Sequence, residues 1–246
     1  MAAVVKHIDH DFESIYIRLR QKEGRIYSNK ELIQLPLIYR THPLYKEWKI
    51  RNQSCKRLIN HLGKKNKSLD ILEVGCGNGW LSARLAAHTK GNVTGIDINS
   101  QELKQAQDVF KHISNLRFVH GDIRNEIPGD KKFNSIIFAA SIQYFPSLNE
   151  IIDCALQRVL PMGEIHILDS HFYKAHEIEE AKQRSLNHFR GVGYPDMAKL
   201  YYHHCITDLE KYNYNIIYNP HSFANKLMGK KNPFYHICIT KNTSIA

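Results

Sequence analysis

Three glycines at alternate positions, and two aspartates further along the chain, are the residues of this 246-residue sequence best suited to chemistry. Gly75, Gly77 and Gly79 stand between an apolar run and a helical pattern. Glycine adopts backbone conformations closed to other residues and lets a ligand approach the main chain. Asp97 and Asp122 follow the next two apolar runs. The pattern therefore indicates a ligand site at the carboxyl ends of neighbouring strands.

Two familiar glycine-loop sites do not fit. A dinucleotide-binding loop, G-x-G-x-x-G, needs its third glycine at position 80, where this chain has Trp80. A phosphate-binding loop of the ATPase type needs Gly-Lys-Ser/Thr after the glycines, and that sequence does not follow here.

The elements around these residues alternate. Short runs rich in Ile and Val, interspersed with amphipathic helical patterns, predict a parallel sheet built from βαβ units. Strands are expected at 69–74, 93–98, 116–120, 133–139 and 164–169, then at 214–218 and 234–240 as an antiparallel finish. Helices are expected at 81–88, 103–113, 148–159, 174–190 and 196–211, and through most of the first 64 residues.

The segment Ile71-Leu-Glu73-Val-Gly75-Cys76-Gly77-Asn78-Gly79 resembles the first motif of class I S-adenosylmethionine-dependent methyltransferases. Asp97 lies 22 residues after Gly75, and Asp122 ends the following strand, as in that family. The segments Phe133–Phe145 and Val159–Leu168 resemble its fourth strand with the loop after it and its helix-to-fifth-strand junction. The resemblance implies a doubly wound, seven-stranded, mostly parallel Rossmann-like α/β sheet with an N-terminal helical cap.

The same resemblance implies the cofactor S-adenosylmethionine and a set of residues around it. Asp97 would accept hydrogen bonds from the ribose hydroxyls and Asp122 from the adenine amino group, although aspartate also favours helix N-caps. Glu73 would anchor the glycine loop or the cofactor's amino group, since an unpaired charge inside an apolar strand is costly. The expected cofactor-binding residues are Glu73, Gly75, Cys76, Gly77, Asn78, Gly79, Asp97, Ile98, Asp122, Ile123 and Ala139.

Methyl transfer from a sulfonium needs chiefly positioning of the acceptor and exclusion of water. Tyr144 and His171 each follow a core strand, and we expect them to orient the acceptor or remove a proton. The segment Ser141–Phe145 lacks the Pro-Pro-Tyr pattern of enzymes that methylate nucleobase amino groups. It resembles the loop of small-molecule methyltransferases, so the expected function is methylation of a small organic acceptor.

Two alternatives stay open. Residues 1–70 carry a net charge of about +8 out of +10, which suits either a nucleic-acid methyltransferase or a solvated helical surface. A cofactor-binding protein without catalysis is the other alternative.

Five distant cysteines, no long apolar run and a polar N-terminus predict a cytoplasmic protein without membrane span or signal peptide. No metal site is expected, because His166, His171 and His176 run from strand to loop to helix.

The expected domain organisation follows from these elements. Residues 1–64 are predicted to form the helical cap and residues 65–246 the methyltransferase core. A substrate-covering insertion is expected at about 171–212, where tyrosines and histidines gather. The acceptor, the methylated atom and the oligomeric state do not follow from the sequence.

Overall fold

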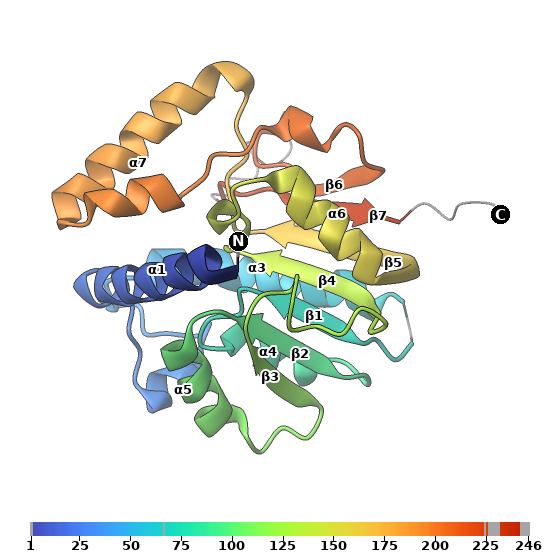
Figure 1. Cartoon of the computed structure of the whole chain (residues 1–246). Helices are drawn as coiled ribbons and strands as arrows, with labels where there is room; N and C mark the ends of the chain where they lie inside the picture. Colours follow the sequence, from blue (N-terminus) through green and yellow to red (C-terminus); the bar gives the residue numbers. More distant parts are fainter. Residues whose placement is uncertain (1, 66, 224, 226–231, 242–246) are drawn as a thin grey trace.

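A seven-stranded sheet in the order β3-β2-β1-β4-β5-β7-β6 forms the centre of the computed structural model (Figure 1). The structure describes residues 2–65, 67–223, 225 and 232–241. The strands are β1 (Ile71–Val74), β2 (Val93–Asp97), β3 (Leu116–His120), β4 (Phe133–Ala139), β5 (Val159–Leu168), β6 (Tyr214–Tyr218) and β7 (His236–Thr240). Strands β1 to β5 pair in parallel, and β7 is antiparallel to both β5 and β6. The predicted fold class, including the antiparallel finish, is confirmed.

The chain reverses its direction of winding at β1. It goes from β1 outward to β2 and β3, then returns to place β4 and β5 on the other side of β1. The carboxyl ends of β1 and β4 therefore flank a crevice, which is where open parallel sheets bind ligands. The central strands β1 and β4 are largely buried on both faces, and seven of their eleven side chains are Ile, Leu, Val or Phe.

Helices cover the two faces of the sheet. The helices are α1 (Ala2–Lys22), α2 (Asn29–Gln34), α3 (Tyr45–Gly63), α4 (Trp80–Ala86), α5 (Ser100–Phe110), α6 (Leu148–Arg158) and α7 (Ile178–Val192), with 3-10 turns η1 (Ile142–Tyr144), η2 (Ala175–Glu177), η3 (Pro195–Leu200) and η4 (Ile206–Leu209). One core joins the sheet to α3, α4 and α5, and a second joins it to α6 and η4. Helix α3 has an apolar stripe, formed by Trp48, Cys55, Leu58 and Leu62, which is buried in the first core.

The N-terminal helix α1 lies across the end of the sheet where the strands terminate, on the same side as α7 (Figure 1). A third apolar cluster joins α1 to α7 and η3 through Leu19, Phe189 and Met197. Glu13 ties α1 to the start of α5, since its Oε1 accepts hydrogen bonds from the backbone N–H and the hydroxyl of Ser100, at 2.8 and 2.5 Å. The N-terminal helices therefore lie over the crevice, while the predicted domain boundary at residue 64 stays a prediction.

Two expectations about elements are wrong. The helix predicted over 196–211 is a pair of 3-10 turns, η3 and η4, with an extended segment between them. The backbone there bonds to neighbouring loops: Tyr202 N–H donates to Gln143 at 2.7 Å, and His204 C=O accepts from Tyr173 at 3.0 Å. The fifth strand begins at Val159 rather than at residue 164, because Val159 already pairs with Phe133 of β4. In the described part of the chain, no helix has both the length and the hydrophobicity needed to cross a membrane.

Candidate functional site

The glycine loop between β1 and α4 has a backbone that only glycine adopts without strain. Gly75, Gly77 and Gly79 have φ of +72°, +52° and +75°. A Cβ on Gly75 would lie 2.5 Å from the Cβ of Ser141, and a Cβ on Gly79 would lie 2.5 Å from the ring of Phe118. The backbone of the loop is therefore not covered by side chains of its own. The absence of a Cβ at Gly79 lets α4 begin close to Phe118 of β3.

Glu73 lies inside β1 and is only 2% exposed. Its Oε2 accepts a hydrogen bond of 2.5 Å from the hydroxyl of Ser82 on α4, so it ties the strand to the helix that follows the loop. Burial, with a smaller contribution from nearby Asp97, raises the pKa of Glu73 to about 8. The carboxyl group is therefore largely protonated at neutral pH in this state.

Asp97, at the end of β2, binds the glycine loop directly. Its Oδ2 accepts the backbone N–H of Gly77 at 2.6 Å, and its Oδ1 accepts the backbone N–H of Asn99 at 2.8 Å. Burial raises the pKa of Asp97, although these two hydrogen bonds oppose the shift. Each carboxylate oxygen keeps a further acceptor position for a ligand.

Asp122 follows β3 and pairs with Arg124 two residues later. Its Oδ1 accepts from the backbone N–H and the Nε–H of Arg124, both at 2.8 Å, and its Oδ2 lies 2.6 Å from Nη2. The contact fixes the carboxylate at the rim of the crevice and leaves an acceptor position available on Oδ2.

A cavity of about 400 Å³ lies between Asp97 and Asp122 on one side and helix α1 on the other. That volume lies within the range of small-ligand sites. Its lining is mainly apolar, with the carboxylates at one side. The lining includes Phe12, Tyr16, Gly75, Gly77, Asp97, Ile98, Asp122, Ile123, Ala140 and Tyr144.

A second cavity, of about 670 Å³, adjoins the first. Helices α1, α3 and α7 contribute to its walls. The two cavities share Tyr16, Gly75, Gly77, Ala140 and Tyr144. Of the remaining predicted residues, Glu73, Cys76, Asn78, Ala139 and His171 line only the second cavity, and Gly79 lines neither.

Tyr144 lies where the two cavities meet. Its ring packs edge-on against Phe12, Tyr16 and Tyr201, with centroids 5.5, 5.7 and 5.8 Å away. Burial raises the pKa of the Tyr144 hydroxyl. The side chain is therefore suited to donating a hydrogen bond rather than to removing a proton.

His171 lies in the second cavity just after β5, and its ring packs on Phe234 with the centroids 4.6 Å apart. Burial lowers the pKa of His171, and the nearby Arg184 and His221 act in the same direction. The imidazole is neutral at pH 7 and able to accept a proton. His166 is buried in the sheet and lines neither cavity, so the two histidines do not form a joint site.

Sequence reasoning missed Arg20 and Glu102, which also line the second cavity. Arg20 Nε and Glu102 Oε2 are buried and have no hydrogen-bond partner among the described residues. Glu102 Oε2 would lie 3.2 Å from a Cβ on Gly77, so this carboxylate borders the glycine loop. Burial raises the pKa of Glu102 to about 7, against the opposing charge of Arg20. The one signal in the sequence was the spacing of Tyr16 and Arg20, four residues apart on one face of a helix.

The orphaned polar atoms and the bare loop fit the cofactor that the sequence resemblance implied. A zwitterionic amino-acid group would give the Arg20 guanidinium and the Glu102 carboxyl the partners they lack. The backbone of Gly75 and Gly77 lines both cavities and is not covered by a Cβ. It therefore connects the second cavity, which contains Arg20 and Glu102, to the first cavity beside Asp97.

Comparison with known sequences places the chain in context. A family described as a methyltransferase domain matches residues 65–223. Malonyl-acyl-carrier-protein O-methyltransferase from Acetivibrio thermocellus is 32% identical over 117 residues, which are 47% of this chain and 41% of that protein. Putative methyltransferase YqeM from Bacillus subtilis is 32% identical over 135 residues, which are 53% of this chain and 50% of that protein. The chain thus spans half or less of the length of these relatives.

Solved structures share the fold. Magnesium protoporphyrin IX methyltransferase from Synechocystis PCC 6803, with bound S-adenosylhomocysteine, superposes with a TM-score of 0.62 at 16% identity, covering 96% of this chain and 99% of that one. The YcgJ protein from Bacillus subtilis gives a TM-score of 0.60 at 13% identity, covering 78% of this chain and 100% of that one. At these identities the likeness establishes the architecture.

Proposed function

Because the chain belongs to the methyltransferase domain family, we propose that it transfers the methyl group of S-adenosylmethionine to a small organic acceptor. The family match confirms the enzyme class and the cofactor that the resemblance of the sequence motifs implied. The identity of the acceptor and the role of each residue are proposals. The observation that carries them is the junction of two cavities at Gly75, Ala140 and Tyr144 beneath helix α1.

In this proposal the first cavity holds the adenosine. Asp97 uses its remaining acceptor positions for the two ribose hydroxyls, while its bonds to Gly77 and Asn99 fix its orientation. Asp122, held by Arg124, accepts from the adenine amino group. Ile98 and Ile123 supply the apolar surface on which the base packs.

The glycine loop and the side chains of Arg20, Glu102 and Glu73 would hold the amino-acid part of the cofactor. Arg20 pairs with the carboxylate, and Glu102 or Glu73 accepts from the ammonium group. Both carboxyl groups have pKa values raised by burial, and a cation beside them would favour their ionised forms. Cys76, Asn78 and Ala139 complete the apolar and polar lining on that side.

When bound, S-adenosylmethionine supplies a methyl group already activated on a sulfonium. The protein's residues then need to hold the acceptor in line and exclude water. Tyr144 donates a hydrogen bond that orients the acceptor, and neutral His171 accepts a proton where the acceptor loses one. Helix α1 closes the junction through Phe12 and Tyr16.

A small acceptor suits the second cavity because aromatic rings that pack on one another form part of its lining. The rings of Tyr16, Tyr144, Tyr201 and Phe189 also favour an acceptor with a flat or aromatic part. The names of the matched relatives, which refer to malonyl-acyl-carrier protein and magnesium protoporphyrin IX, are consistent with a non-nucleic-acid acceptor.

Incubation with S-adenosylmethionine labelled in the methyl group tests the proposal. The protein is offered a metabolite extract and, separately, total RNA from the same cells at low salt. We expect label in the small-molecule fraction that requires both protein and extract. Label in RNA alone, with salt-sensitive RNA binding, would establish the nucleic-acid alternative, and binding of cofactor with no transfer to either pool would establish a non-catalytic protein.

A further inference from the structure

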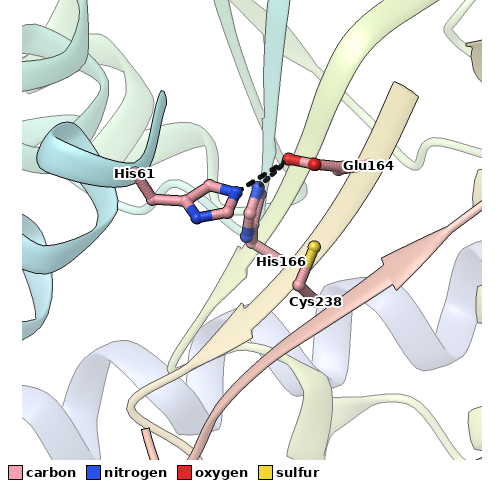
Figure 2. Close-up of side chains that lie close together, drawn as sticks. All are labelled: His61, Glu164, His166 and Cys238. Carbon is pink, nitrogen blue, oxygen red and sulfur yellow. Dashed lines mark hydrogen bonds and ion pairs between the residues drawn. The ribbon is translucent and has the colours of Figure 1, made fainter. Parts of the chain in front are cut away.

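A second group of reactive side chains lies outside both cavities. His61, Glu164, His166 and Cys238 each offer a metal-ligating atom, and these four atoms all lie within 4.8 Å of one another. Figure 2 shows the four side chains converging from three elements of the fold. None of them lines either cavity of the candidate site.

The fold explains why they meet. Glu164 and His166 are two residues apart on β5, so their side chains lie on the same face of the sheet. His166 is the register partner of Cys238 on the antiparallel neighbour β7. His61 reaches the same point from the last turn of α3, which covers this face.

The contacts within the group are short and centred on one oxygen. Glu164 Oε2 lies 3.1 Å from His61 Nε2 and 3.1 Å from His166 Nε2. Burial opposes ionisation of Glu164, but hydrogen bonds from His166, Lys65 and His61 outweigh it and lower the carboxyl pKa. Cys238 is 3% exposed and has no hydrogen-bond partner among the described residues.

We propose that His61 Nε2, His166 Nε2, Glu164 Oε2 and Cys238 Sγ form a structural zinc site. Two imidazole nitrogens, one carboxylate oxygen and one thiolate are ligands of the types that zinc takes in tetrahedral sites. Four protein ligands leave no open position for substrate, which makes the site structural rather than catalytic.

The residues around the ligands complete the site. Lys65 Nζ lies 2.8 Å from Glu164 Oε1, the oxygen that points away from the imidazoles, and so orients the carboxylate. His166 Nδ1 lies 3.2 Å from His236 Nε2. A neutral His236 ring can therefore accept a hydrogen bond at Nε2 from His166 Nδ1–H. Such outer hydrogen bonds fix the tautomer and direction of metal-bound histidines.

Proton balance follows from this arrangement. Zinc takes the positions of the Nε2 protons, so His61 and His166 carry their single proton on Nδ1 instead. Burial raises the pKa of the Cys238 thiol to about 12, and zinc would displace its proton to solvent.

The site would fasten α3 to strands β5 and β7. The other end of α3 contributes Trp48 and Arg51 to the second cavity, so the bound ion would hold one wall of that cavity in place. This role is independent of methyl transfer, and its test needs no acceptor.

Cobalt and zinc titrations of the chelator-treated full chain test the proposal. We expect one Zn²⁺ per chain, and a Co²⁺ complex with strong visible bands of tetrahedral geometry and a thiolate-to-cobalt charge-transfer band. Cys238→Ala should abolish the charge-transfer band, and His61→Gln should weaken Zn²⁺ binding by about 100-fold or more, at least as much as loss of an outer partner. Zinc should raise the unfolding midpoint of the wild type but not of His61→Gln.

Matched variants separate these effects from loss of folding. Cys55→Ala removes another buried thiol, from α3, and His88→Gln removes an exposed histidine, and both should bind zinc like the wild type. His61 is partly exposed at the end of a helix, so its replacement should leave the fold intact, as a circular dichroism spectrum would verify. Absence of stoichiometric zinc binding by the wild type, or unchanged binding by folded His61→Gln, would overturn the proposal.

Discussion

The carboxylate of Asp97 accepts the backbone N–H of Gly77 at 2.6 Å, which joins the tip of β2 to the loop that follows β1. The same carboxylate lines the first cavity, so one side chain both shapes the glycine loop and faces the ligand space. An acid at the end of the second strand can therefore both hold the glycine loop in its conformation and contact a ligand in the first cavity.

Gly75→Ala should remove cofactor binding and destabilise the fold. The added Cβ would lie 2.5 Å from that of Ser141, and a φ of +72° costs a non-glycine residue about 1–2 kcal/mol. Thermal unfolding and calorimetry with S-adenosylhomocysteine measure both effects. Gly129→Ala is the control, because its Cβ meets nothing within 4 Å. Normal binding by Gly75→Ala would show that the loop does not cradle the ligand.

Arg20→Met should weaken binding of S-adenosylhomocysteine by about 10-fold or more, since it removes a charge-assisted contact to the carboxylate. Binding of 5′-methylthioadenosine, which lacks the amino-acid group, should stay the same. Calorimetry with both ligands gives the comparison, and exposed Arg18→Met serves as the control. An equal loss of affinity for the two ligands would show that Arg20 does not contact the amino-acid group of the cofactor.

Tyr144→Phe should lower kcat about 10-fold or more and change affinity for S-adenosylhomocysteine by less than about 2-fold. The expected rate loss corresponds to one hydrogen bond to the acceptor, about 1.4 kcal/mol. Steady-state kinetics with the acceptor identified by the labelling experiment tests it, with exposed Tyr39→Phe as the control. Parallel losses in turnover and affinity, or no loss, would remove Tyr144 from the acceptor site.

Glu73→Gln should change how stability depends on pH. Burial raises the pKa of Glu73 to about 8, so its contribution to stability is full below the pKa of the unfolded chain, about 4.3, and is lost as pH rises through 8. That loss has a slope of up to about 1.4 kcal/mol per pH unit. Glu73→Gln removes the titrating carboxyl group and with it this pH-dependent loss of stability. Denaturant unfolding should therefore show the variant gaining stability relative to the wild type as the pH rises from 5 to 8.

The exposed Glu210→Gln variant provides the comparison for that series. It should track the wild type across the same pH range. A constant difference between Glu73→Gln and the wild type from pH 5 to 8 would show that Glu73 does not carry a raised pKa.

Local patterns predicted most of the sheet and one half of the site. Six of the seven strands begin and end within two residues of their predicted limits, and only β5 begins earlier, because continuous Ile and Val runs have few other stable placements. The glycines and Asp97 were predictable because their spacing along the chain is set by one βαβ unit. The segment 196–211 was not, since its backbone bonds to distant Gln143 and Tyr173 override its local helical pattern.

The remaining site residues depend on packing between distant segments. Arg20 lines the second cavity only because α1 lies against α7 and η3, a contact that no periodicity reveals. The second cavity likewise needs α3 and α7 at its sides. His61 and Glu164, 103 positions apart, meet only once α3 covers the sheet. From the sequence alone, each of these side chains could equally be an ordinary surface or core residue, and only the tertiary structure shows that they lie together.

Calorimetric titration of S-adenosylhomocysteine into the wild type and Asp97→Ala addresses the central claim most directly. Loss of the ribose hydrogen bonds should weaken binding by about 2 kcal/mol or more, roughly 30-fold, while exposed Asp108→Ala binds like the wild type. The circular dichroism spectrum of Asp97→Ala should match that of the wild type. An affinity of the folded Asp97→Ala protein equal to that of the wild type would contradict the assignment of this cavity to the cofactor.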